Sequence, residues 1–139
     1  MCSNKLDLNN KTIFVTGAAG FIGANLVTKL LNECVGTTIV GIDNVNDYYD
    51  VSLKEYRLTE IHKIAMHATT NKWFFVKANI ADKPLLDDLF KQYSPQIVIN
   101  LAAQAGVRYS IDHPDVYIEA NIIGFYNILE ACRKYPVEH

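Results

Sequence analysis

The sequence has little net charge and no long apolar run. Its net charge is −2, with 13 basic and 15 acidic residues interspersed along 139 positions. This balance excludes the basic stripe that a nucleic-acid-binding surface needs. Half of the residues are apolar, which excludes the low hydrophobicity and strong charge imbalance of disordered chains. We therefore expect a folded domain without a nucleic-acid partner.

Signals for export, membrane insertion and metal binding are also lacking. The apolar runs are much shorter than the roughly 20 residues of a membrane span. The first residues, Met1 to Asp7, lack the apolar segment of a signal peptide. Cys2, Cys34 and Cys132 are odd in number and widely spaced, without metal-ligand or Cys-x-x-Cys spacing. These absences favour free thiols, no membrane partner and a cytoplasmic location.

Apolar strand and helix patterns alternate along the chain, whose length suits one domain. A polar loop follows at 103–113, and a long helix then extends to about Lys134, with Asp112 as its N-cap and Pro114 in its first turn. Residues 1–10 are expected to be an N-terminal extension, and residues 11–139 one incomplete domain. The predicted strands cover 11–16, 38–43, 73–77 and 96–101, and the predicted helices before the loop cover 20–32, 52–67 and 83–93.

The alternation predicts an α/β fold, a Rossmann-type doubly wound parallel sheet with strand order 3-2-1-4. The chain stops where a fifth strand should begin, so the strand at 96–101 is expected to be an unpaired edge. We expect that the natural protein continues beyond His139, or that a second copy covers this edge, which leaves a homodimer open.

A glycine-rich turn lies between the first strand and the first helix, in the order Thr16-Gly17-Ala18-Ala19-Gly20-Phe21-Ile22-Gly23. Gly17 permits a sharp turn, Gly20 permits close approach of a pyrophosphate, and Gly23 permits close packing of helix on strand. The amide groups and the dipole of the helix would then hold the phosphates. Plain structural turns also contain glycines, so the surrounding elements must support the prediction.

Asp43 provides that support, because it ends the second strand 20 residues beyond Gly23. An acid at this place accepts hydrogen bonds from the adenosine ribose and repels a 2′-phosphate. The alternative is a helix cap or turn residue. The combination of strand, glycine turn, helix and acid favours binding of NAD over NADP.

The glycine turn resembles the fingerprint of extended short-chain dehydrogenases that act on nucleotide sugars. Three further segments are similar to UDP-glucuronate 4-epimerases: GIDNVNDYYDVSLK at 41–54, NLAAQAGVRYS at 100–110 and NIIGFYNILE at 121–130. The resemblance spans nearly the whole chain from Lys11. It implies NAD as cofactor and a nucleotide sugar as substrate, with UDP-glucuronate converted to UDP-galacturonate.

The resemblance also implies a mechanism that this chain alone does not complete. In the family, a tyrosine of a Tyr-x-x-x-Lys motif takes the proton of the sugar 4-hydroxyl, and hydride passes to NAD and returns to the other face of a 4-keto sugar. No such motif follows the fourth strand. The tyrosines on either side of that strand do not qualify, because the residue four positions after Tyr93 is Ile97 and the residue four positions after Tyr109 is His113. We therefore assign no catalytic residue and expect this piece to be inactive alone.

The cofactor-binding residues are predicted around the glycine turn and after each strand. Two residues depart from the family pattern: Asn100 replaces the usual His, and Asn79 stands where Asp often faces the adenine, although its amide can still form hydrogen bonds there. The predicted residues are Gly17, Ala19, Gly20, Phe21, Ile22, Gly23, Asp43, Asn44, Asn79, Ile80, Leu101, Ala102, Ala103 and Gln104.

Other residues leave alternatives open. Arg108 either binds a sugar carboxylate or phosphate, or forms a surface salt bridge. Tyr48 and Tyr49 either flank the substrate or cover the end of the sheet. Asn121 and Asn127 lie near one helix face and are expected to hold the loop after the fourth strand.

Two classes of function compete. The first is the N-terminal part of a nucleotide-sugar 4-epimerase, with a nucleotide-sugar 4,6-dehydratase or another epimerase as the alternative enzyme. The second is a non-catalytic NAD-binding module.

Overall fold

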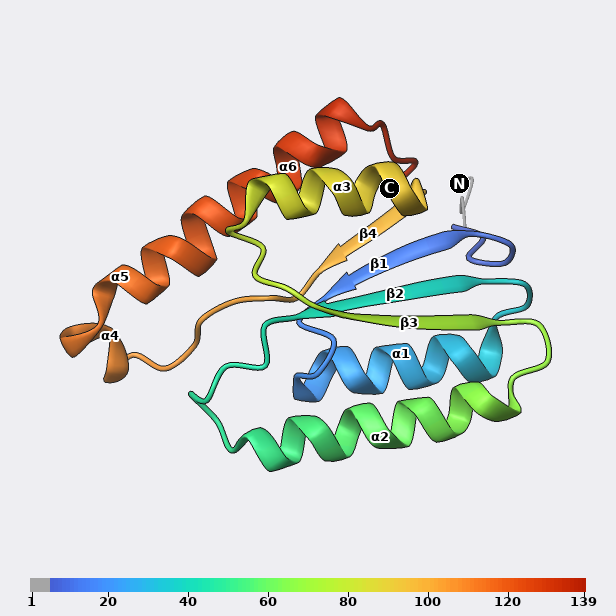
Figure 1. Cartoon of the computed structure of the whole chain (residues 1–139), viewed down its shortest axis with the longest axis horizontal. Coiled ribbons are helices and arrows are strands. Elements are labelled where there is room, and N and C mark those ends of the chain that lie inside the picture. Colours follow the sequence, from blue (N-terminus) through green and yellow to red (C-terminus); the bar gives the residue numbers. More distant parts are fainter. Residues whose placement is uncertain (1–5) are drawn as a thin grey trace, which may run out of the picture.

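A computed structural model of the chain describes residues 6–139 as a four-stranded parallel sheet with helices on both faces (Figure 1). The strand order is β3-β2-β1-β4, which confirms the predicted Rossmann-type sheet. The predicted extension at 1–10 lies partly outside the described residues, and so does Cys2. The strands are β1 (Thr12–Thr16), β2 (Thr38–Asp43), β3 (Lys72–Lys77) and β4 (Ile97–Asn100).

The helices pack in pairs on the two faces of this sheet (Figure 1). Side chains of a strand alternate between faces, so β1 serves both layers. Ile13 and Val15 pack with α1 and α2, whereas Phe14 packs with α3 and α6, and all three are fully buried. The helices are α1 (Phe21–Glu33), α2 (Val51–His67), α3 (Lys83–Tyr93) and α6 (Phe125–Lys134).

Side-chain caps explain where α2 and α3 begin. The Asp50 carboxylate accepts a hydrogen bond from the Ser52 amide, and the Asp82 carboxylate accepts one from the Leu85 amide. Pro84 stands in the first turn of α3, where its missing N–H leaves no acceptor unsatisfied. These local signals are readable in the sequence, and α3 has its predicted bounds.

The segment after β4 differs from the prediction. A one-turn helix, α4 (Tyr109–Asp112), lies inside the predicted loop, and Asp112 is its last residue. The prediction of Asp112 as N-cap was therefore wrong, and α5 (Pro114–Tyr117) begins without a side-chain cap. The expected single α-helix contains a π-helical segment, η1 (Ile118–Gly124), before α6. A π turn accommodates an extra residue that the 3.6-residue pattern does not reveal.

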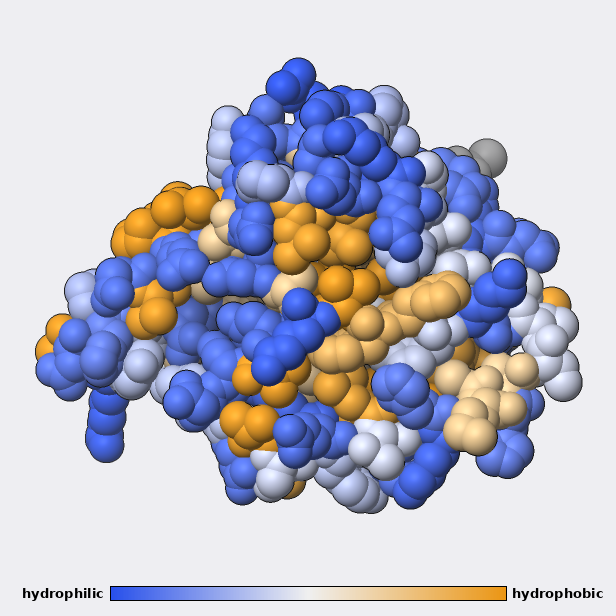
Figure 2. Space-filling model, in the orientation of Figure 1, coloured by the Kyte–Doolittle hydropathy of each residue, from blue (hydrophilic) through white to orange (hydrophobic). Residues whose placement is uncertain are grey.

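The two outer strands differ in how they are covered. The final residues of the chain lie beside β4, where the Glu138 amide donates to the Gln96 carbonyl (2.7 Å) and the Val98 amide to the His139 carbonyl (3.0 Å). The edge at β4 is thus covered in part, contrary to the expectation of an unpaired edge. At the other edge, Figure 2 shows apolar residues gathered over β3 between helices of the two faces, where Phe74 is 42% exposed.

Candidate functional site

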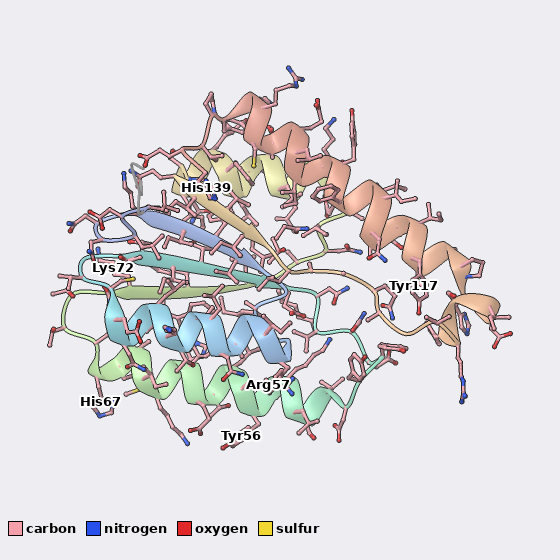
Figure 3. The ribbon with its side chains drawn as sticks, turned by 180° about the vertical axis from the view of Figure 1, so that it is seen from behind. Tyr56, Arg57, His67, Lys72, Tyr117 and His139 are labelled. Carbon is pink, nitrogen blue, oxygen red and sulfur yellow. The ribbon has the colours of Figure 1, made fainter. Side chains whose placement is uncertain are left out.

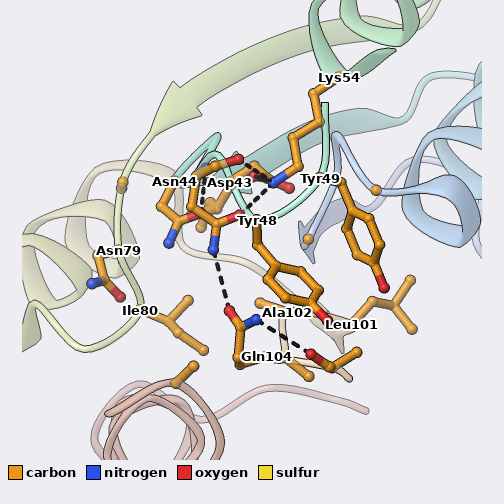
Figure 4. Close-up of a pocket in the computed structure, with 18 residues that line it drawn as sticks. Asp43, Asn44, Tyr48, Tyr49, Lys54, Asn79, Ile80, Leu101, Ala102 and Gln104 are labelled. Atoms are coloured by element: carbon orange, nitrogen blue, oxygen red, sulfur yellow. Dashed lines mark hydrogen bonds and ion pairs between the residues drawn. The ribbon is translucent and has the colours of Figure 1, made fainter. Parts of the chain in front are cut away.

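A pocket lies at the carboxyl ends of the strands, where open α/β sheets bind ligands. Its walls come from the turn after β1, the loop after β2, the end of β3 and the loop after β4 (Figure 4). Of the residues predicted from the sequence, it is lined by Gly17, Gly20, Asp43, Asn44, Asn79, Ile80, Leu101, Ala102, Ala103 and Gln104.

The glycines of the β1–α1 turn are required by close backbone contacts. Gly17 has φ +69°, and a Cβ there would lie 2.8 Å from the Ala102 nitrogen. A Cβ on Gly23 would lie 2.1 Å from the Gly17 carbonyl oxygen, so Gly23 lets α1 begin directly against the turn. A Cβ on Gly20 would meet only that same carbonyl, at 3.1 Å, and Gly20 borders the pocket. The geometry agrees with the turn predicted at Gly17 and the close packing predicted at Gly23, whereas approach of a pyrophosphate to Gly20 stays a prediction.

The first turn of α1 offers main-chain donors at the pocket. The Phe21, Ile22 and Gly23 amides have no hydrogen-bond acceptor among residues 6–139, as expected for the first turn of a helix. The Phe21 and Ile22 side chains point outward and are 72% and 67% exposed. Phe21, Ile22 and Gly23 do not line the pocket, so their role stays a prediction that rests on the main-chain N–H groups next to Gly20 and on the helix dipole.

Asp43 is buried in the pocket wall and is held in a fixed orientation. Its Oδ2 accepts a hydrogen bond from the Ala19 amide (3.0 Å), and its Oδ1 accepts one from the Val45 amide (2.8 Å). Ala19 therefore supports the site through Asp43 and does not line the pocket itself. A carboxylate has about four lone-pair sites, so two remain for ligand hydroxyl groups.

Lys54, in the first turn of α2, is a pocket residue that the sequence did not identify. Its Nζ donates to the side-chain oxygen (2.7 Å) and to the carbonyl oxygen (3.1 Å) of Asn46 and lies 3.9 Å from Asp43 Oδ1. The side-chain Nδ2 of Asn46 in turn donates to Gln104 Oε1 at 3.4 Å. This hydrogen bond connects the loops after β2 and β4 (Figure 4). Because α2 must first dock on the sheet, residue spacing alone could not have revealed these contacts.

The end of β4 is tied to β1 by a buried hydroxyl group. Thr16 Oγ1 donates to Asn100 Oδ1 (2.6 Å) and accepts hydrogen bonds from the Leu101 and Ala102 amides, both at 3.1 Å. Asn100, where the family usually has His, thus fixes the strand end that leads into the pocket. Farther along, the Gln104 amide donates to Asn121 Oδ1, and Asn121 Nδ2 donates back to the Gln104 carbonyl. This confirms that Asn121 holds the loop.

The side chains of two asparagines form hydrogen bonds that differ from those expected. Asn127 donates to the Ile80 and Ala81 carbonyls, so it holds the loop after β3 rather than the loop after β4. Asn79 lines the pocket, but its Oδ1 accepts from the Ala81 amide and its Nδ2 donates to Glu119. Contact between Asn79 and an adenine therefore stays a prediction.

Aromatic side chains close one side of the pocket. Tyr48 packs edge-on against Tyr49, with ring centres 4.6 Å apart, and lies 4.9 Å from Tyr109 of α4. Partial burial raises the pKa of Tyr48, and the neighbouring tyrosines raise it further. The Tyr117 hydroxyl, which Figure 3 shows beside the loop after β4, shares its one hydrogen between the Ala105 and Gly106 carbonyls. Tyr48 and Tyr49 thus cover the sheet end, and both line the pocket.

Arg108 lies outside this arrangement. Its side chain is exposed, it does not line the pocket, and it forms no salt bridge with any residue in 6–139. The salt-bridge alternative for Arg108 is therefore not found within residues 6–139, and its contact with a sugar carboxylate or phosphate stays a prediction. Besides Lys54 and Asn46, the lining residues that sequence analysis missed are Ile42, Ala78, Ala105 and Ala120.

Within residues 6–139, no group of His, Cys, Asp and Glu side chains is arranged to hold a metal ion. Over the same stretch, no helix is long and apolar enough to cross a membrane. Cys34 and Cys132 are free thiols, and partial burial raises the pKa of each.

Comparison with known proteins adds to this geometry. Residues 14–139 match the family model described as GDP-mannose 4,6-dehydratase. The chain is 45% identical to Protein CapI of Staphylococcus aureus over 91% of this chain and 35% of that protein. It is 43% identical to UDP-glucuronate 4-epimerase 4 of Arabidopsis thaliana over 91% of this chain and 27% of that protein. The chain thus spans about a third of the length of the curated relatives that it matches.

A solved structure shows the same arrangement of elements. UDP-glucose 4-epimerase from Stenotrophomonas maltophila, crystallised with NAD and formylated UDP-arabinopyranose, superposes with a TM-score of 0.74. The sequences are 28% identical, and the match covers 91% of this chain and 34% of that chain.

Proposed function

Because the chain belongs to the family described as GDP-mannose 4,6-dehydratase, we propose that it is the NAD-binding N-terminal part of a nucleotide-sugar 4-epimerase. The observation that carries the proposal is the pocket itself. Gly17 and Gly20 of the β1–α1 turn and the buried Asp43 carboxylate border one cavity at the carboxyl ends of the strands, and α1, with the free amides of its first turn, begins directly after Gly20. A diphosphate needs the amides, and a ribose diol needs the acid.

In this proposal, each part of the dinucleotide is bound by a separate feature of the chain. The Phe21, Ile22 and Gly23 amides hold the diphosphate, and Gly20 lets it approach. Asp43 accepts hydrogen bonds from the adenosine ribose. Ala102, Ala103 and Gln104 pass beside the nicotinamide half. Bound NAD would supply the hydride acceptor and donor for the sugar carbon. The chain's own residues bind and orient the cofactor for that exchange.

The substrate follows from the named relatives. UDP-glucuronate 4-epimerases match this chain over about nine-tenths of its length, which supports interconversion of UDP-glucuronate and UDP-galacturonate. A nucleotide-sugar 4,6-dehydratase is the second candidate because the matching family model carries that description. In either case the Tyr-x-x-x-Lys pair must come from residues outside these 139, and the chain alone should bind cofactor without converting sugar.

Calorimetric titration of NAD into the chain tests cofactor binding. We expect Asp43→Ala to weaken NAD binding about tenfold or more, the usual effect of losing hydrogen bonds to a charged group. Asp47→Ala is the matched control, because Asp47 is an exposed acid in the same loop. Equal NAD affinity of the wild type and Asp43→Ala would remove the ribose contact from the proposal.

Epimerase activity is tested on the full-length protein of which this chain is a part. Incubation with UDP-glucuronate should give UDP-galacturonate and no net reduction of NAD. A 4-keto-6-deoxy product from a nucleotide hexose would instead identify the dehydratase.

A further inference from the structure

Lys54 is the one cation among the described residues that line the pocket, as Asp43 is the one anion. Its side chain is only 9% exposed, and that of Asp43 is 7% exposed. Burial of an ammonium group is costly unless opposite charge and hydrogen bonds compensate it. Binding a neutral ribose diol through Asp43 does not by itself require a lysine here, so the position of Lys54 needs its own explanation.

The hydrogen bonds of Lys54 leave it one free N–H group. Two N–H groups are taken by the oxygens of Asn46, whereas Asp43 Oδ1, at 3.9 Å, lies beyond hydrogen-bond distance. Figure 4 shows the ammonium group of Lys54 beside Asp43 at the wall of the pocket. Lys54 therefore compensates the charge of Asp43 and keeps a donor for a ligand oxygen.

The charges of Lys54 and Asp43 bear on whether this side of the pocket accepts a ribose with a 2′-hydroxyl or one with a 2′-phosphate. With both residues present the wall is neutral, and an adenosine ribose with a free 2′-hydroxyl brings no charge. A 2′-phosphate brings close to two negative charges next to the Asp43 carboxylate and is repelled. Without that carboxylate, Lys54 would be left as an uncompensated cation, and the Ala19 and Val45 amides would have lost their acceptor. A phosphate supplies both the charge and the acceptors.

We propose that Lys54 is the residue that, together with Asp43, sets the cofactor preference. Lys54 can bind a 2′-phosphate, but the adjacent Asp43 carboxylate neutralises its charge and repels the phosphate. Removal of the acid alone therefore changes the cofactor preference of the site from NAD to NADP. The inference rests on the proposed function, since it assumes that the adenosine ribose lies at Asp43.

A second cation must be distinguished from Lys54. Arg57 lies one turn farther along α2 and is visible in Figure 3. Its Nη1 donates to the Ala19 carbonyl at 3.3 Å, and its guanidinium lies 5.9 Å from the centre of the Phe21 ring. Arg57 does not line the pocket, and among the described residues Asp43 forms an ion pair with Lys54 and none with Arg57. We therefore assign the 2′-phosphate to Lys54 and not to Arg57.

The test is a calorimetric comparison of NADP binding to variants of the chain. Asp43→Ala should bind NADP at least about tenfold more tightly than the wild type does, the scale of a hydrogen bond between charged groups. Adding Lys54→Met should abolish this gain. Adding Lys63→Met should leave it unchanged, because Lys63 is an exposed lysine on the same helix with a side chain 64% exposed.

Two results would overturn the proposal. One is an unchanged NADP affinity in Asp43→Ala, and the other is a gain that survives Lys54→Met, in particular one lost with Arg57→Met instead. If Asp43→Ala gives no cooperative thermal transition, the comparison is repeated with Asp43→Asn, which keeps the shape of the side chain. Binding of NAD by the wild type reports separately on the proposed function, so failure of one is distinguishable from failure of the other.

Discussion

Gly23→Ala tests how closely α1 must lie against the β1–α1 turn. The new Cβ would lie 2.1 Å from the Gly17 carbonyl oxygen, almost an ångström inside the 3.0 Å limit that real Cβ contacts respect. It would also lie 2.9 Å from the Gly17 carbonyl carbon and 3.0 Å from the Ala18 Cα. All three atoms belong to the backbone, so no side-chain rotation relieves the contact. The helix and the turn must move apart.

Two opposing effects set the magnitude. Replacing a helical glycine by alanine favours folding by about 1 kcal/mol, because alanine loses less backbone entropy. Overpacking a closely packed site costs about 1–3 kcal/mol, and a rigid backbone contact belongs at the upper end. We expect a net destabilisation of about 1–2 kcal/mol, which corresponds to a fall in Tm of about 3–8 °C for a domain of this size. NAD binding should weaken as well, since the displaced turn carries the Ala19 amide that orients Asp43.

Thermal unfolding and NAD calorimetry on the same samples measure both effects. Gly20→Ala is the matched control for stability: it lies in the same turn, but its Cβ would meet only the Gly17 carbonyl oxygen, at 3.1 Å, so a shift of a few tenths of an ångström relieves the contact. Its Tm should change by less than half as much. Wild-type Tm and NAD affinity in Gly23→Ala would refute the reasoning.

Three further substitutions probe other contacts. Thr16→Val should lower the free energy of unfolding by about 1–3 kcal/mol in denaturant titrations, because the Ala102 amide and the Asn100 oxygen lose their partner and the Leu101 amide keeps only the Thr16 carbonyl, at 3.3 Å. Asn71→Ala should cost about 2–3 kcal/mol in the same assay with unchanged NAD affinity, because Asn71 joins the end of α1 to β3 far from the pocket. Hydrogen bonds from Lys134 and Lys91 hold the pKa of Asp87 well below its usual value near 3.8, so the unfolded chain binds this proton more readily. Asp87 therefore stabilises the fold above that value and loses its effect as the pH falls further, and Asp87→Asn should flatten the pH dependence of unfolding below about pH 4.

Local patterns predicted most of the fold. Continuous apolar runs identified the buried parallel strands, and Pro84 in the first turn with the break at Ser94-Pro95 identified the bounds of α3. The glycine turn and Asp43 were assigned because their roles depend on sequence order: a glycine beside a strand end, and an acid one strand farther along. The same local logic failed after β4, since a one-turn helix and a π segment leave no periodic signal in the sequence.

What the sequence by itself determined was the order of elements, the doubly wound sheet and the edge at which a ligand would bind, because these follow from interactions between near neighbours in the chain. Only the tertiary structure decided that Lys54 lies 3.9 Å from Asp43 and that Thr16 holds the end of β4. These contacts join residues brought together by packing of α2 on the sheet and by pairing of β1 with β4. Their spacing along the chain has no fixed relation to their distance in space.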